Sequence, residues 1–166
     1  MTQVCKICGK KATDGCQAAI PAITGELCQP CRKRLSAGAD HGAWLEALAA
    51  PVLLLQGQPR QVVAANQRAL ALFGKELVEV AGHRGGQVFD CLHSFSAAGC
   101  GLDSHCEECK IKGAIVDTFA TDTPHHAVAA TLPLKKGDGI RNYLLQVSTQ
   151  KIGDLALVRV ERYEGV

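Results

Sequence analysis

The fold is decided by residues 51–74, which read PVLLLQGQPRQVVAANQRALALFG. Two apolar runs, 52–55 and 61–65, flank a glycine- and proline-containing connection of hairpin length and therefore predict two strands. Asn66 then stands at the position of an N-cap, because its side chain can accept from a free backbone N–H at the start of a helix over residues 67–73. The apolar positions that share one face of this helix are Ala69, Leu70 and Phe73.

Helical patterns are visible on both sides of this stretch. Residues 43–50 predict a short amphipathic helix, and residues 75–80 predict another short helical turn. Ser104 and Glu107 have the spacing of a capping box, so we expect the clearest helix of the protein to begin near His105 and to end near Ala120.

Three strands are expected in the last part of the chain, over residues 125–134, 140–150 and 154–162. Glycine and aspartate between them supply the turns that hairpins need. The order strand, strand, helices, strand, strand, strand describes an α+β fold, with an antiparallel sheet and its helices on one face.

Composition excludes several broad classes of protein. The chain has 166 residues, a net charge of 18 − 16 = +2, 47% apolar residues and 20% charged residues, which is typical of a globular protein. No uncharged apolar run is long enough to cross a bilayer, and the first residues lack the pattern of a secretory signal. We therefore expect a cytoplasmic protein with no membrane segment, and the charge balance does not favour nucleic acid as a partner.

The nine cysteines are divided between two clusters. Five lie within residues 5–31 and four within residues 91–109. In a reducing compartment such cysteines are first interpreted as metal ligands or redox groups.

The amino-terminal cluster predicts a structural zinc site. Its ligands form two C-x2-C knuckles, typical of a zinc-ribbon or treble-clef module: Cys5, Cys8, Cys28 and Cys31. A segment of this size buries too little apolar surface to fold unaided, and zinc binding can supply the missing free energy. We expect a zinc module over residues 1–35, a linker over 36–42 and a second domain over 43–166. The alternative is four reduced thiols in a loosely ordered leader, and Cys16 is either a free thiol or a substitute ligand.

The second cluster has the spacing C-x8-C-x5-C-x2-C and consists of Cys91, Cys100, Cys106 and Cys109. Four thiolates suit either Zn²⁺ or a [4Fe–4S] cluster, and the spacing does not choose between them. His93 or His105 could replace one cysteine as a ligand. The remaining alternatives are apolar core cysteines and a pair of disulfides.

Residues 43–163 resemble a PAS sensor domain. The two strands and the helix of residues 51–74 look like the opening of that family, with Asn66 and Gly74 at its motif positions. The second cysteine cluster looks like that of a cysteine-rich bacterial PAS subgroup found in signalling proteins. The resemblance implies a five-stranded sheet, a four-cysteine site between the halves of the sheet, and either a small ligand held between sheet and helices or signalling through dimer contacts.

These observations lead to a functional hypothesis with two alternatives. We expect a cytoplasmic sensor or adaptor that acts through a signalling partner or a homodimer. The first alternative is a redox or gas sensor with a [4Fe–4S] cluster at the second site, and the other is a nucleic-acid-binding regulator that uses the basic residues of the zinc module. No enzyme motif is present, and thiol-disulfide exchange at a C-x-x-C pair is the only catalysis that the sequence offers.

Overall fold

The structure is a computed structural model that describes residues 45–57 and 60–166. The predicted zinc module, its four cysteines and the linker lie outside these residues. The elements, in chain order, are β1 (Val52–Gln56), β2 (Gln61–Ala65), α3 (Gln67–Phe73), α4 (Leu77–Val80), α5 (Gly85–Phe89), the 3-10 turns η1 (Leu92–Phe95) and η2 (Ser104–Cys106), α6 (Lys110–Thr121), β3 (His125–Lys136), β4 (Gly139–Ile152) and β5 (Leu155–Gly165).

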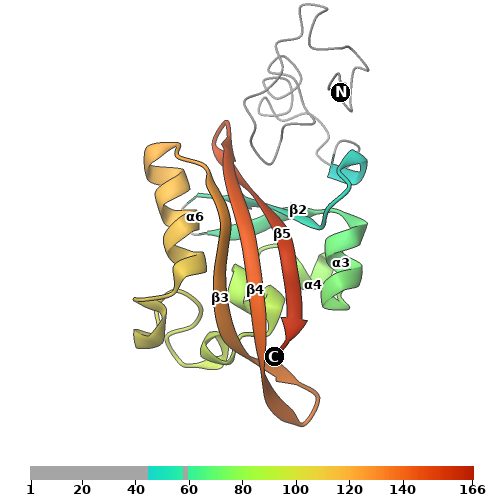
Figure 1. Cartoon of the computed structure of the whole chain (residues 1–166), viewed down its shortest axis with the longest axis vertical. Coiled ribbons are helices and arrows are strands. Elements are labelled where there is room, and N and C mark those ends of the chain that lie inside the picture. The colour runs from blue at the N-terminus through green and yellow to red at the C-terminus, as the bar shows by residue number, and fades with distance from the viewer. Residues whose placement is uncertain (1–44, 58–59) are drawn as a thin grey trace, which may run out of the picture.

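The five strands form one antiparallel sheet in the order β2-β1-β5-β4-β3. The first strand along the chain, β1, therefore pairs with the last, β5. The long strands β3, β4 and β5 lie side by side (Figure 1). This confirms the predicted five-stranded antiparallel sheet and its two amino-terminal strands.

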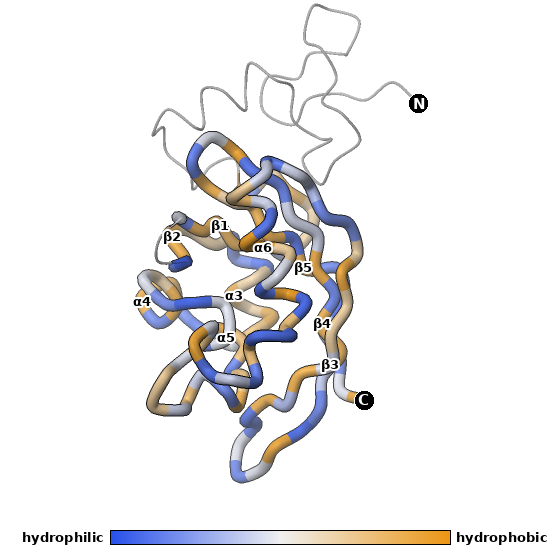
Figure 2. Tube along the Cα trace, turned by 90° about the vertical axis from the view of Figure 1, so that its left-hand side faces the viewer, coloured by the Kyte–Doolittle hydropathy of each residue, from blue (hydrophilic) through white to orange (hydrophobic). Residues whose placement is uncertain are grey.

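The strand β1, which lies between β2 and β5, is buried on both of its faces. Leu53 and Leu55 pack into the main core, together with side chains of α3 to α6. Val52 and Leu54 point the other way, because successive side chains of a strand alternate, and pack in a second cluster with Leu45. Figure 2 shows α3, α4 and α5 on one side of the long strands. The prediction of helices on one face holds for α3 to α6, whereas the helical turn at residues 45–47 packs against the opposite face.

The start of the strongest predicted helix was placed wrongly. Ser104 and Glu107 form no capping box; the carboxylate of Asp103 instead accepts from the backbone N–H of His105 at 2.9 Å and opens the 3-10 turn η2. Because Cys109 has an extended backbone (φ −68°, ψ 110°), the helix α6 begins only at Lys110. Its end at Thr121 agrees with the prediction.

The short helix α5 carries no clear sequence signal. The helix α5 begins with two glycines, which disfavour a helix by about 1 kcal/mol each. Burial of Val88 and Phe89 in the main core outweighs this cost. No helix of the described residues is both long and apolar enough to span a membrane.

Candidate metal centre

Four segments bring the second cysteine cluster together. Cys91 follows α5, Cys100 lies in the loop between the two 3-10 turns, Cys106 ends η2, and Cys109 is the N-cap of α6. All four side chains line one cavity of about 60 Å³. None of them is in a disulfide. The sequence prediction that these four residues form one site agrees with where the structure places them.

Much of the remaining wall of the cavity is apolar and comes from the sheet, α5 and α6. Its apolar side chains are Leu55, Phe89, Ile111, Ile115 and Leu132. A drug-sized organic ligand needs a pocket of about 300 Å³ or more, so this cavity suits a compact group. The arrangement is a small, thiol-lined space beside the main core.

The position of Cys91 is set by the edge of the sheet. Asp90 ends α5 in a left-handed conformation (φ 61°), and its carbonyl accepts from the Lys135 N–H of β3 at 2.8 Å. Its carboxylate pairs with Lys75 at 2.7 Å. Cys91 then forms an isolated bridge with Leu134. The first thiol is thus anchored to β3.

Two glycines bring backbone donors to the sulfur atoms. The N–H of Gly86 donates to Cys100 Sγ at 3.3 Å, and the N–H of Gly101 donates to Cys106 Sγ at 3.3 Å. A Cβ at Gly86 would lie 2.6 Å from Cys100 Sγ, so only glycine fits this approach. Such donors stabilise a sulfur that carries negative charge.

Three cationic side chains lie at the cavity. Arg84 donates to the Cys100 carbonyl at 2.6 Å and Lys112 to the Gly101 carbonyl at 2.8 Å, while Arg60 also lines the cavity. Among the described residues that line it there is no carboxylate. A group with net negative charge, such as four thiolates around a metal centre, is electrostatically matched to this environment.

Without a cation among them, the buried thiols favour their protonated, uncharged form. Burial raises the pKa of Cys91 and of Cys100, and the neighbouring thiols raise both further. The His93 N–H opposes the rise at Cys91, as the Gly86 N–H and Arg60 do at Cys100. Four thiols that face one cavity all lose their protons only when a cation lies among them.

The spacing of the sulfur atoms bears on the size of that group. Ligands of one tetrahedral Zn²⁺, at about 2.3 Å from the ion, are about 3.8 Å from one another. The four thiols do not form a group whose atoms all lie within 4.8 Å. Four thiolates suit either Zn²⁺ or a [4Fe–4S] cluster.

The remaining predicted site residues are not part of this cavity. His93 and His105 do not line it; they line a neighbouring hollow together with Cys91, Cys106 and Cys109. Sequence reasoning missed Gly86, Arg84 and Lys112, which only the folded chain brings to the thiols.

The described chain has a PAS-like fold, with five antiparallel strands and a helical layer between the second and third strands. No family model matches the chain, and no curated protein matches it. Among solved structures it is similar to a LOV protein of Rhodobacter sphaeroides (12% identity, 81% of this chain, TM-score 0.46), of whose length the match covers 65%.

Two further similar structures are PAS domains. One belongs to the nitrogen regulation protein NR(II) of Vibrio parahaemolyticus, with 16% identity over 72% of this chain and 94% of that chain and a TM-score of 0.47. The other belongs to a LuxR-family transcriptional regulator of Burkholderia thailandensis, in complex with ethanol, with 11% identity over 76% of this chain and 97% of that chain and a TM-score of 0.46. At these identities the likeness concerns the fold alone.

Proposed function

We propose that the protein is a signalling sensor whose PAS-like domain holds a metal centre at Cys91, Cys100, Cys106 and Cys109. The observation that carries this proposal is the convergence of four thiols, from four separate segments, on one small apolar cavity. A metal centre there would supply redox or ligand-binding chemistry. The chain holds it by sulfur, donates to two of the sulfurs from backbone N–H groups and offsets its charge with three cations.

The signal would be a change in the order of the residues that carry the thiols. Residues 91–109 contain only two short 3-10 turns, η1 and η2, and such a segment has little regular backbone pairing of its own. Loss or oxidation of the centre would loosen this segment and the start of α6, since their positions depend on the shared group. A signalling partner or a second copy of the chain would read the altered surface.

A [4Fe–4S] cluster is the second candidate form of this function, because four thiolates that face one cavity are the ligand set that such a cluster uses. In this form the protein is a redox or gas sensor. In the zinc form the same site is structural, and the domain signals through its contacts alone.

Anaerobic purification of the full chain, followed by metal analysis and a visible spectrum, tests both forms. Iron with inorganic sulfide and a brown colour supports the cluster. Zinc beyond the amount bound by the amino-terminal cysteines, without visible absorption, supports the structural form and excludes the cluster. A protein with neither metal at the second site would contradict the proposal.

The ligand assignment is tested by a pair of cysteine variants. Cys106→Ser should lower both the melting temperature and the metal content, because a ligand in the core is lost. Cys16→Ser should change the melting temperature less. Equal melting temperatures and metal contents for the two variants would contradict the assignment.

The amino-terminal residues add two proposals that concern the undescribed part of the chain. Cys5, Cys8, Cys28 and Cys31 bind zinc, and the basic residues beside them contact a protein or nucleic acid. Binding to DNA or RNA that weakens steeply with salt would support the nucleic-acid form. Absence of such binding would leave protein contacts as the output.

A further inference from the structure

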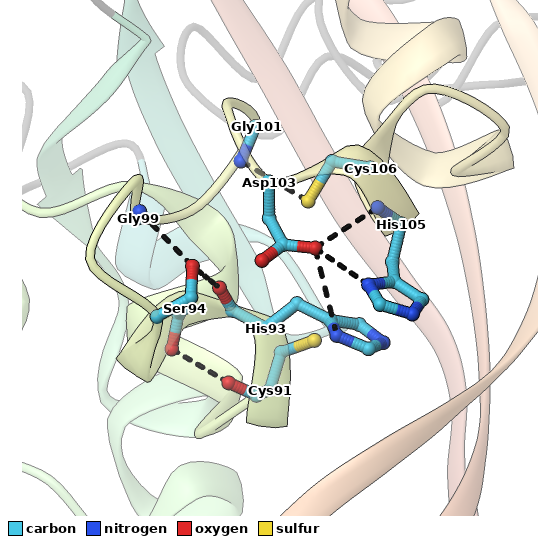
Figure 3. A network of polar contacts seen from close by, with 9 residues as sticks. Cys91, His93, Ser94, Gly99, Gly101, Asp103, His105 and Cys106 are labelled. Carbon is cyan, nitrogen blue, oxygen red and sulfur yellow. Dashed lines mark hydrogen bonds and ion pairs between the residues drawn. The ribbon is translucent and has the colours of Figure 1, made fainter.

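His93, Asp103 and His105 form a second cluster beside the thiols (Figure 3). One carboxylate oxygen, Asp103 Oδ1, lies 2.7 Å from His105 Nδ1 and 3.9 Å from His93 Nδ1. One ligand atom from each of the three side chains lies within 4.8 Å of the other two. Among the residues that the structure describes, no other group of three or more histidine, cysteine or acidic side chains meets this criterion.

The carboxylate is fixed in place and ionised. Asp103 accepts from the backbone N–H of His105 at 2.9 Å as well as facing its ring. Together with the hydroxyl of Ser96, these contacts lower the pKa of Asp103 to about 2. The cluster therefore presents a carboxylate oxygen between two imidazoles.

We propose that His93, Asp103 and His105 bind one divalent transition-metal ion, at a site distinct from the four thiols. Two imidazoles and one carboxylate form a ligand set for Zn²⁺, Fe²⁺, Co²⁺ or Ni²⁺, whereas Mg²⁺ and Ca²⁺ prefer oxygen alone. The inference does not depend on the proposed metal centre, because it uses none of the cysteines.

Three protein ligands leave coordination positions open to the surface. Both histidines line a hollow of about 480 Å³ between the thiol-bearing segment and the edge strand β3. The side chain of His105 is 67% exposed, whereas that of His93 is 23% exposed. An ion can therefore enter from solvent, and water or a small ligand can complete its coordination.

Binding requires only a small movement of the rings. Ligands about 2.1 Å from one ion lie about 3.0–3.5 Å apart, which is close to the two distances from Asp103. The imidazole rings are stacked, with centroids 4.3 Å apart and planes 8° apart, so their lone pairs run parallel and do not yet converge. To bring these lone pairs onto one ion, the exposed His105 ring must turn, and the metal ion would replace the direct contact of its Nδ1 with Asp103.

The test is a Co²⁺ titration of the full-length protein as purified, with its resident metals counted beforehand. We expect one additional equivalent of Co²⁺, with an absorption spectrum that lacks a sulfur-to-cobalt charge-transfer band because the ligands are nitrogen and oxygen. His105→Ala and Asp103→Asn should each weaken this binding at least about tenfold, since even a lost partner of a metal ligand costs about that much. Asp103→Asn retains an oxygen that accepts from the His105 N–H, so it also serves as the variant that preserves the local fold.

The matched control is His125→Ala. His125 also contacts a carboxylate, that of Asp117, at 2.7 Å, but this contact is a pair rather than a group of three. The additional Co²⁺ should be retained in this variant. The proposal is overturned if no additional equivalent binds, if the sulfur band accompanies it, if both site variants retain it, or if His125→Ala loses it equally. The proposed metal centre is judged separately, from the metals counted before the titration.

Discussion

Asn66 joins three parts of the domain through one side chain. It is fully buried, and its Oδ1 accepts from the N–H groups of Val52 at 3.1 Å and Ala69 at 3.0 Å. Its Nδ2 donates to the carbonyls of Leu45 at 3.1 Å and Ala50 at 2.8 Å. The sequence predicted Asn66 as a helix cap. In the structure it also connects α3 to the strand β1 and to the helical turn on the opposite face of the sheet.

Replacement of Asn66 should be among the most destabilising single changes in the domain. Asn66→Ala removes a helix cap and leaves buried backbone groups without partners, so we expect a loss of about 3 kcal/mol in the free energy of unfolding. The same replacement at Asn142, which is exposed on β4, should change it by less than about 0.5 kcal/mol. Urea unfolding measures both, and similar losses for the two variants would contradict the role given to Asn66.

Gly86 and Gly113 offer a matched pair of glycines within helices. A Cβ at Gly113 meets nothing within 4 Å, so Gly113→Ala should stabilise the protein by about 0.5–1 kcal/mol. A Cβ at Gly86 would lie 2.6 Å from Cys100 Sγ and 3.2 Å from its Cβ, so Gly86→Ala must displace this thiol. We expect a lower metal content and a lower melting temperature for Gly86→Ala alone. Full metal content in that variant would show that Cys100 is not a ligand.

At the scale of elements, α6 is attached to the sheet by a buried pair of hydroxyls. Thr118 of α6 and Thr149 of β4 are both fully buried, and their oxygens lie 2.7 Å apart. The hydroxyl of Thr118 also lies 3.0 Å from the carbonyl of Thr123, which can accept its proton. Because a hydroxyl has one proton and Thr118 donates it to this carbonyl, the Thr149 hydroxyl donates to the Thr118 oxygen.

This order of donors predicts unequal costs for two similar replacements. Thr118→Val leaves the Thr149 hydroxyl and the Thr123 carbonyl without this partner, so we expect a loss of about 2 kcal/mol. Thr149→Val keeps the bond between Thr118 and Thr123 and should cost less. In the double variant the two losses should not add, because the residues share one bond. Equal single losses in urea unfolding would contradict the assigned donors.

Element boundaries followed the sequence only where the signal was local. The cap at Asn66 and the left-handed Gly74 bound α3 as predicted, because both act within one helical turn. The apparent capping box at Ser104 failed because Asp103, one residue earlier, caps the 3-10 turn instead by accepting from the His105 N–H.

At the scale of the whole molecule, the proposed metal centre joins the irregular segment to the sheet. Removal of the metal by a chelator, or oxidation of the centre, should raise hydrogen exchange over residues 91–112. Residues 139–152 of β4 should keep their protection, because they pair with strands on both sides and pack into the main core. Exchange that rises equally in both segments, or in neither, would contradict this division.

The sequence by itself determined the amino-terminal strands, the capped helix α3 and the three final strands, and it predicted the four cysteines of the proposed metal centre. These follow from alternation, turn residues and spacing, which act over a few residues. The tertiary structure alone decided that β1 lies between β2 and β5, that α5 exists, and that Arg84 and Lys112 face the thiols. The physical reason is that these features arise from packing and electrostatic contacts between residues distant in the chain. Such contacts leave no local sequence pattern from which they could be predicted.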